Sequence, residues 1–489
     1  MQKLLNLIHF GQLTNWSERS REAIADIFGS PGGRYPERAK QSFTIRAPDF
    51  SSASGVPFTA LIDPSNPDSG AYGGMSFVIF PVEDRAALFG MVIGTQGLSP
   101  DEEILGRPGH GRKIRAICSW LNSKYGKGKM VAWAKQDPAR IDLDMPGNIK
   151  SLFSDFQAAF KKYGKVIYGF YVPDENPQKT EEALKAFLDL MFLERGYYPL
   201  TNAEKEARKI QASYYANILP HTDNQTVADL LTERKYVVLQ GPPGTGKTRM
   251  SLELLRHTYH NNGQAIQFHP NTTYENFVGG LAPIHTEETL GLQFKPKPGF
   301  LMEAAGQATT NPDKPYLLII DEINRADLAK VLGEAIFLLE PFEEGRSLKL
   351  AYEYEQSYGS MLHLPPNLHI LGTMNSSDRS IAIVDIAVRR RFAFLKLWPQ
   401  ISIVEAHGNE LMLQAFQGLL AIFLEYADDE GMELMPGHSY FLERDQDKAL
   451  KSLQVHLLPL LEEYLKQGYV TAFADSLQAY LQWLESLKT

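Results

Sequence analysis

The residues best suited to chemistry form the segment Gly241-Pro-Pro-Gly-Thr-Gly-Lys-Thr248, which directly follows the apolar run of residues 236–239. Its glycines allow a tight backbone turn, so that successive N–H groups can point at a chain of phosphates. Lys247 is placed to bridge the outer phosphates, and the Thr248 hydroxyl to bind Mg²⁺. We therefore expect a nucleoside triphosphate to be bound here by Gly241, Pro242, Pro243, Gly244, Thr245, Gly246, Lys247 and Thr248.

A second chemical feature lies downstream, where the apolar run of residues 316–320 ends in two carboxylates, Asp321 and Glu322. A buried strand would deliver Asp321 to the Mg²⁺ shell and leave Glu322 to orient and deprotonate an attacking water. An acid pair after an apolar run is a weak motif alone. The upstream phosphate-binding segment, with a further apolar run at residues 265–268 between the two, makes it a strong one. The sequence thus predicts hydrolysis of a nucleoside triphosphate.

Two further clusters could complete such a site. Asn375 follows the apolar run of residues 368–373, where its amide could reach between the outermost phosphate and the water held by Glu322. Residues 389–391 are consecutive arginines at the end of a predicted helix. They suit an arginine finger that acts on a neighbouring subunit's nucleotide, and the alternative is a helix C-terminus that simply carries cations.

These residues need a scaffold whose strands end at a common edge. From residue 225 onward, strand, loop and helix patterns alternate, which predicts an α/β domain with a parallel sheet flanked by helices. The amphipathic runs 411–425 and 450–466 predict a helical C-terminal region, with a kink or restart at Pro459. In the N-terminal part, short β-like runs between residues 43 and 93, followed by helical patterns, predict an α+β domain.

Length and composition bound the remaining possibilities. A chain of 489 residues exceeds a usual single core, and we expect domains at residues 1–200, 201–400 and 401–489. The single Cys118 excludes a disulfide framework, and no apolar run reaches the length of a membrane helix. These features predict a cytoplasmic protein without a membrane partner.

The net charge of −9 conceals an uneven distribution. Residues 1–200 carry 24 basic and 22 acidic side chains, and the stretch 107–165 alone carries 13 basic against 4 acidic. This block could attract a DNA backbone, with Arg112, Lys113 and Arg115 as the first candidates, and the alternative is a solvated lysine-rich surface. Nearby aromatic residues could form either a pocket for a flipped base or ordinary core: Tyr72, Phe89, Trp120 and Trp133.

Five segments carry a resemblance to a known family. They are Gly241 to Thr248, Ile320-Asp-Glu-Ile-Asn-Arg-Ala326, Met374-Asn-Ser-Ser-Asp-Arg-Ser380, Arg389-Arg-Arg-Phe392 and Gly437-His-Ser-Tyr-Phe441. In this order they resemble the AAA+ motor of McrB, the NTPase subunit of modification-dependent restriction systems. The resemblance spans residues 205–480 and implies an AAA+ fold whose C-terminal helical lid closes over the nucleotide base.

The resemblance also implies roles for single residues. Asn375 matches the family's sensor asparagine, Asp378 matches the acid of the family signature, and His438 lies in the sensor region that leads into the lid. Arg389 and Arg390 resemble the residues that face a neighbouring subunit's nucleotide. One departure is the Ser-Ser pair inside the signature, where the best-known form has Thr-Ala.

For the assembly, the resemblance implies a homo-hexamer that uses Mg²⁺ and GTP or ATP to move on DNA in defence against phage. A separate McrC-like nuclease subunit would cut, since the sequence shows no nuclease motif of its own. The N-terminal domain would recognise DNA, modified or not, or another ligand. Two alternatives are a protein-remodelling ATPase of the MoxR kind, against which the signature argues, and a nucleotide-switched scaffold, against which Glu322 and Asn375 argue.

Overall fold

The computed structural model of the chain describes residues 1–10, 13–48, 55–67, 71–96, 101–284, 293–340, 342–343, 345–354, 358–377 and 385–487. The described chain divides into two compact units, residues 1–219 with 424–428 and residues 220–423 with 429–489. Helix α8 (Thr201–Tyr215) belongs to the first unit, because Ile210 and Tyr214 are buried in its core. The division therefore falls after α8, whereas the sequence placed a boundary before it.

The N-terminal unit is built on an antiparallel sheet, in the order β1-β2-β3-β4-β6-β5 over the described residues. Its strands are β1 (Thr44–Arg46), β2 (Thr59–Ile62), β3 (Met75–Val82), β4 (Arg85–Ile93), β5 (Ala132–Ala134) and β6 (Ile167–Tyr171). Its other helices are α1 (Gln2–His9), α2 (Trp16–Ala25), α3 (Glu102–Gly106), α4 (Pro108–Tyr125), α5 (Gly147–Leu152), α6 (Gln157–Tyr163) and α7 (Pro177–Glu194). This arrangement is the α+β fold that the sequence predicts.

Helices cover both faces of that sheet, which explains why β3 and β4 are almost continuously apolar. Alternate residues of a strand point to opposite faces. Phe77 and Phe89 therefore join the core shared with α1, α4 and α7, while Val78 and Leu88 join the core shared with α5 and α6. A strand buried on both faces keeps apolar residues at every position, and its sequence does not alternate.

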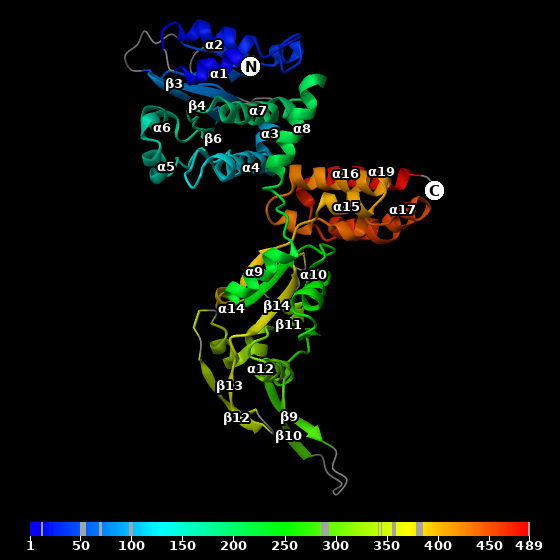
Figure 1. Cartoon of the computed structure of the whole chain (residues 1–489). Helices are drawn as coiled ribbons and strands as arrows, with labels where there is room; N and C mark the ends of the chain where they lie inside the picture. The colour runs from blue at the N-terminus through cyan, green and yellow to red at the C-terminus, as the bar shows by residue number, and fades with distance from the viewer. Residues whose placement is uncertain are drawn as a thin grey trace. The chain divides into compact units, whose positions relative to one another are not determined.

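The second unit contains a parallel sheet with the order β15-β7-β14-β11-β8 in the part of the chain that is described. Its strands are β7 (Tyr236–Gly241), β8 (Gly263–Gln267), β11 (Tyr316–Asp321), β14 (Leu368–Asn375) and β15 (Ala393–Lys396). The helices of this part are α9 (Asn224–Arg234), α10 (Lys247–Glu253), α11 (Tyr274–Phe277), α12 (Phe300–Thr310), α13 (Leu328–Leu332) and α14 (Ile386–Arg391). The predicted parallel sheet flanked by helices is confirmed, and Figure 1 shows β11 and β14 running through its centre.

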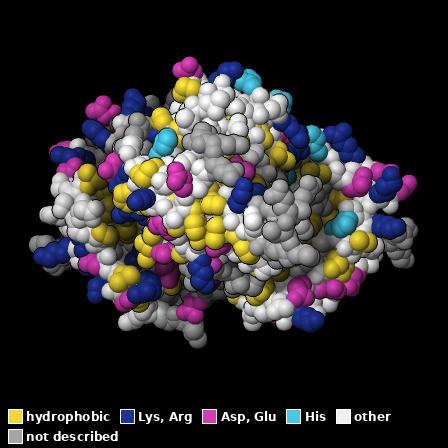
Figure 2. All heavy atoms as spheres, turned by 90° about the horizontal axis from the view of Figure 1, so that it is seen from below, with side chains coloured by type: hydrophobic (Ala, Val, Ile, Leu, Met, Phe, Trp, Pro, Cys, Tyr) yellow, Lys and Arg dark blue, Asp and Glu magenta, His cyan; other side chains and the backbone are white. Residues whose placement is uncertain are grey.

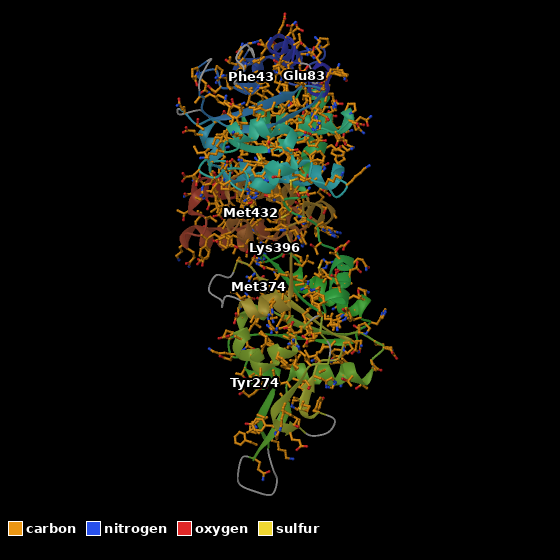
Figure 3. The ribbon with its side chains drawn as sticks, turned by 90° about the vertical axis from the view of Figure 1, so that its left-hand side faces the viewer. Phe43, Glu83, Tyr274, Met374, Lys396 and Met432 are labelled. Carbon is orange, nitrogen blue, oxygen red and sulfur yellow. The ribbon has the colours of Figure 1, made fainter. Side chains whose placement is uncertain are left out.

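Two hairpins extend this unit beyond the sheet. One pairs β9 (Gly279–Ile284) with β10 (Gln293–Pro298), and the other pairs β12 (Ser347–Tyr354) with β13 (Gly359–His363). Figure 1 shows both at the same end of the unit, and Tyr274 in Figure 3 lies toward that end. Figure 2 looks from that side and shows basic and acidic side chains interspersed over the visible face.

The C-terminal region is helical, as the sequence predicts. It contains α15 (Ile401–His407), α16 (Glu410–Tyr426), α17 (Gln446–Ser452), α18 (Leu458–Lys466) and α19 (Ala474–Ser486). Pro459 lies in the first turn of α18, after a five-residue π-helical segment, so the predicted restart is confirmed. Edge-to-face ring contacts, such as Phe416 with Phe441 at 5.2 Å between centroids, lie in its core. None of the helices within the described ranges is long and apolar enough to cross a membrane.

Candidate functional site

The candidate site is a cavity of about 560 Å³ in the second unit. The strands β7, β11 and β14 are parallel neighbours, so their carboxyl ends share one edge of the sheet. Ligands of open α/β sheets bind at this edge. The cavity is lined by residues 243–248 of the predicted phosphate-binding segment, by Glu322 and Asn375, and by His438 from the C-terminal region, whereas Gly241 and Pro242 are not part of its described lining.

The phosphate-binding segment has the backbone that its glycines predict. Gly244 and Gly246 adopt positive φ angles of 81° and 85°, a region that favours glycine, and α10 begins at Lys247. The Lys247 ammonium is buried and donates to the carbonyl oxygens of Gly241 and Pro242, each at 2.8 Å. Burial lowers the pKa of Lys247 to about 8, although Glu322 and Asp321 act in the opposite direction.

The proposed metal ligands meet as the sequence expects. The Thr248 hydroxyl donates to Asp321 Oδ1 at 2.9 Å, across 73 residues of sequence. A hydroxyl and a carboxylate are oxygen donors of the kind that Mg²⁺ prefers, and Mg²⁺ takes most of its other ligands from water and substrate phosphates. The side chains present therefore fit an Mg²⁺ ion.

Glu322 and Asn375 also come together. The Asn375 amide donates to Glu322 Oε1 at 2.7 Å. Glu322 Oε2 is buried without a hydrogen-bond partner among the described residues, although the Arg325 Nε atom lies 3.5 Å from it. Met374, labelled in Figure 3, marks the end of β14 that carries Asn375. The amide thus holds one carboxylate oxygen of Glu322 beside the cavity and leaves the other with unused capacity.

The segment around His438 lies directly on the phosphate-binding loop. The backbone N–H groups of Gly437 and Ser439 donate to the carbonyl oxygens of Pro243 and Gly244, at 2.9 and 3.0 Å. A Cβ atom at Gly437 would lie 2.0 Å from a backbone atom of Gly244, so the close approach requires glycine. His438 accepts a hydrogen bond at Nδ1 from the backbone N–H of Gln400 at 3.4 Å, and burial lowers its pKa to about 4. His438 is therefore a neutral side chain beside the loop at physiological pH.

Several lining residues carry no motif, and sequence reasoning missed them. They come from the segment before α9, from the end of β15 and from α15: His221, Thr222, Trp398, Gln400, Ile403 and His407. Only the fold brings these segments together, although an aromatic residue directly after a strand end, as at Trp398, is a weak signal. Lys396 in Figure 3 marks this strand end, and its Nζ atom lies 2.5 Å from Glu433 Oε1, next to Met432.

The remaining predicted residues lie elsewhere. Arg389 and Arg390 of α14 are outside the described lining of the cavity. Arg390 pairs with Glu340 at 2.9 Å, and the Arg389 guanidinium lies 5.2 Å from the ring centre of Phe394. Asp378 falls outside the described residues.

The N-terminal unit has a cavity of its own, of about 300 Å³. Beside aliphatic residues, its walls include four aromatic rings and two cations: Arg46, Phe58, Tyr72, Phe80, Lys162 and Tyr163. The Arg46 guanidinium lies 5.7 Å from the ring centre of Phe58 and 5.6 Å from that of Tyr72. Of the aromatic residues singled out in the sequence, Tyr72 lines this cavity, whereas Phe89 and Trp120 are buried in the core.

The basic block requires a correction. Arg112 and Lys113, expected to face DNA, are buried in the N-terminal unit. Lys113 donates to Glu194 Oε1 at 2.9 Å, and Arg112 donates to the carbonyl oxygens of Leu424 and Ala427 at 2.9 and 2.5 Å. Burial alone would lower the pKa of Lys113, but Glu194, Tyr215 and Glu425 together outweigh it and raise that pKa. These two cations stabilise the unit and do not form a surface for a polyanion.

Comparisons with known proteins agree with the geometry of the second unit. Residues 236–392 match the family model of the AAA domain, dynein-related subfamily. This match, the parallel sheet and the loop with its acid pair define an AAA+ NTPase domain. Its sequence is McrB-like: it is 32% identical over 268 residues to the EcoKMcrB subunit of a type IV methyl-directed restriction enzyme of Escherichia coli K12.

The extent of the likeness is limited. The E. coli match covers 50% of this chain and 57% of that protein. A second match, to the YdiS component of the type II restriction enzyme BsuMI of Bacillus subtilis, has 27% identity over 194 residues and covers 32% of this chain and 55% of that protein. The chain thus spans little more than half the length of these relatives. Among solved structures, NtrX of Brucella abortus in complex with ATP matches at 10% identity with a TM-score of 0.25, covering 63% of this chain and 81% of that one.

Proposed function

We propose that the chain is the nucleotide-driven motor of a restriction system of the McrBC kind. Hydrolysis of GTP or ATP drives movement on DNA and activates a separate, McrC-like nuclease subunit. The observation that carries the proposal is the convergence of Lys247, the Thr248–Asp321 pair and the Glu322–Asn375 pair on one cavity. The McrB-like sequence of the same domain supports the restriction setting.

In this proposal, the phosphate-binding loop orients the triphosphate through its backbone N–H groups and the start of α10. Lys247 exchanges the carbonyl oxygens of Gly241 and Pro242 for the outer phosphate oxygens, since an ammonium gains more from anions than from carbonyl dipoles. Thr248 and Asp321 hold Mg²⁺. The ion, when bound, neutralises charge that develops on the transferred phosphoryl group.

Glu322 acts on the water. Its carboxylate orients a water molecule in line with the terminal phosphate and accepts the proton that the water loses. Asn375 fixes the carboxylate through the 2.7 Å hydrogen bond and stands where it can also contact the terminal phosphate. His438, neutral and hydrogen-bonded at Nδ1, presents its other ring nitrogen as a donor on the lid side.

The transition state needs further positive charge, which Arg389 and Arg390 supply to a neighbouring subunit in a homo-hexamer. Their position outside the described lining of their own cavity is compatible with such a role in trans. In the sequence, Asp378 completes the family signature three residues after Asn375. A ring follows from this requirement, because a finger that acts only on a neighbour needs that neighbour in place.

The N-terminal unit recognises DNA, with or without a modified base, in this proposal. Its aromatic cavity of about 300 Å³ is supporting evidence, because a base flipped out of the helix is bound by stacking on aromatic rings. Arg46 and Lys162 at the same cavity add positive charge for the backbone.

The test is steady-state hydrolysis of GTP and ATP by the full chain, alone and with modified or unmodified duplex DNA. We expect low basal turnover of one nucleotide that modified DNA increases, and no turnover in Lys247→Ala. Tyr72→Ala should lose the response to DNA and keep the basal rate, while Tyr198→Ala, at a side chain 60% exposed in the same unit, serves as the control. Fast ATP hydrolysis at a rate that DNA does not change would contradict the proposal and favour a protein-remodelling machine. The absence of hydrolysis would favour a nucleotide-switched scaffold.

A further inference from the structure

One threonine connects the two acidic residues of the nucleotide site. Thr373 lies in β14 and is 1% exposed. In the register of the parallel pair, Ile320 of β11 lies opposite Gly372 of β14, so the next residues, Asp321 and Thr373, are neighbours across the strands. We propose that Thr373 is a positioning residue that sets the two carboxylates of the hydrolytic site relative to each other. The inference rests on the proposed function, since it presupposes hydrolysis at this cavity.

The directions of the hydrogen bonds define a single chain. The Glu322 backbone N–H donates to Thr373 Oγ1 at 3.2 Å, and the Thr373 hydroxyl donates to Asp321 Oδ1 at 2.5 Å. A hydroxyl has one proton to donate and lone pairs to accept, so both bonds are made at the same time. One oxygen atom therefore holds the side chain of Asp321 and the backbone of Glu322 together.

The hydrogen bond from the Thr373 hydroxyl to Asp321 fixes the rotation of the Asp321 carboxylate. Asp321 Oδ1 accepts from two hydroxyls, Thr373 at 2.5 Å and Thr248 at 2.9 Å. Two donors from different elements leave the carboxylate little freedom about its last torsion. The metal-binding pair of Thr248 and Asp321 is thus preorganised by Thr373, which is not itself one of the proposed ligands.

The hydrogen bond from the Glu322 backbone N–H to Thr373 holds Glu322 in an uncommon backbone conformation. Glu322 has φ 52° and ψ 46°, the left-handed region, which is strained for a residue other than glycine. Such a conformation persists only where the surroundings hold it. The turn immediately after β11 brings the Glu322 carboxylate within 2.7 Å of the Asn375 amide, and the bond to Thr373 secures that turn.

The consequence concerns hydrolysis more than binding. Without the hydroxyl, the Glu322 N–H loses its acceptor and the Asp321 carboxylate loses a donor, so both carboxylates can shift. A displacement of about 1 Å can cost roughly a hundredfold in rate. Triphosphate affinity depends mainly on Lys247 and the loop N–H groups, which Thr373 does not hold.

The experiment compares Thr373→Val, which keeps the branched shape without the hydroxyl, with Thr373→Ser, which keeps the hydroxyl. The readouts are kcat, KM, the Kd of the nucleotide and the Mg²⁺ concentration that gives half of the maximal rate. In Thr373→Val we expect kcat to fall at least about tenfold and the Mg²⁺ requirement to rise, with the nucleotide Kd changed by less than about threefold. Thr373→Ser should recover kcat to within about threefold of the wild type.

Unchanged kcat and Mg²⁺ dependence in Thr373→Val would overturn the inference. An equal loss in Thr373→Ser would also overturn it, because the methyl group and not the hydroxyl would then matter. If Thr373→Val lacks a cooperative unfolding transition, Thr373→Ala takes its place under the same criteria. A wild-type chain that hydrolyses neither GTP nor ATP would refute the proposed function instead, so the two failures are distinguishable.

Discussion

Buried charges are arranged differently in the N-terminal unit and at the nucleotide site. In the N-terminal unit, two buried cations pair with carboxylates: Arg34 forms two hydrogen bonds with Asp189, at 2.7 and 2.6 Å, and Lys113 bonds Glu194 at 2.9 Å. At the nucleotide site, Lys247 donates to carbonyl oxygens and forms no ion pair with a described carboxylate. Glu322 keeps one buried oxygen without a hydrogen bond in the described structure.

The pKa values of the two buried lysines express the same difference. Burial lowers the pKa of both, but Glu194, Tyr215 and Glu425 together reverse the effect for Lys113, whereas the pKa of Lys247 stays at about 8. A buried charge that is fully paired contributes to the fold. A buried charge that faces a cavity and has no oppositely charged side chain beside it is available to pair with a ligand of opposite charge.

The comparison is tested most severely by removing the unpaired lysine. Lys247→Ala should abolish detectable binding of GTP and ATP, because the outer phosphates lose their ammonium partner, and it should leave the fold intact. Isothermal titration with Mg²⁺ and each nucleotide measures the loss, and circular dichroism monitors the fold. Nucleotide affinity retained within about tenfold of the wild type would contradict the role of Lys247.

Removing the negative charge of Glu322 should separate nucleotide binding from hydrolysis. Glu322→Gln keeps the hydrogen bond from Asn375 but cannot accept a proton, so we expect hydrolysis to slow by about a hundredfold or more with nucleotide affinity nearly unchanged. Single-turnover hydrolysis and nucleotide titration give the two quantities. Asp327→Asn, at an exposed acid that caps α13, is the control and should hydrolyse at the wild-type rate. Unchanged turnover in Glu322→Gln would remove Glu322 from the mechanism.

Removing Lys113, the paired lysine, should lower the stability of the fold and leave nucleotide binding unchanged. Lys113→Met leaves Glu194 with one cation fewer in a buried position, and breaking a buried pair costs about 3 kcal/mol or more. Urea unfolding followed by hydrogen exchange in peptides of α4 and α7 measures this loss in the full chain. Lys40→Met, in the exposed pair with Glu37, should cost less than about 1 kcal/mol. A stable Lys113→Met variant with weakened DNA binding would restore the surface role that the sequence favoured.

The phosphate-binding loop and the acid pair could be predicted because each is local. A strand, a glycine-rich turn and a helix start lie within a few residues of one another, so the chain itself fixes their geometry around Lys247. The acids follow the same logic, since Asp321 ends an apolar strand of a sheet whose other strands end at the same edge. The parallel sheet and the helical C-terminal region followed from patterns of the same kind.

Features that depend on partners distant in sequence could not be predicted. Lys113 and Glu194 are 81 residues apart, and a count of charges treats both as exposed. The role of Thr373 depends on the register between β11 and β14, which no local pattern encodes. Trp398 and Gln400 join the cavity only because the segment after β15 folds over it. Sequence therefore predicted which motif residues meet at the cavity better than the positions of the residues that support them.

The smallest effect is expected from a change of pH, which tests the difference between Lys247 and Lys113 without removing a side chain. Burial lowers the pKa of Lys247 from its ordinary 10.5 to about 8, and only the protonated form can pair with a triphosphate. Below pH 8 the ligand-free ammonium already carries its proton, so Lys247 adds no pH dependence to affinity. Above pH 8 binding must first take up a proton, and the Kd for Mg²⁺ and nucleotide should rise about tenfold per pH unit.

Titrations between pH 7.5 and 9.5 with a non-hydrolysable triphosphate analogue measure this slope without hydrolysis and with Glu322 in place. Lys247→Arg is the matched control, because a guanidinium stays protonated throughout this range and its Kd should be flat. Lys113 contributes nothing here, since Glu194, Tyr215 and Glu425 together raise its pKa. A flat Kd for the lysine protein would mean that Lys247 keeps its proton at pH 9.5, as a paired cation does, and the distinction between the two buried lysines would then be lost.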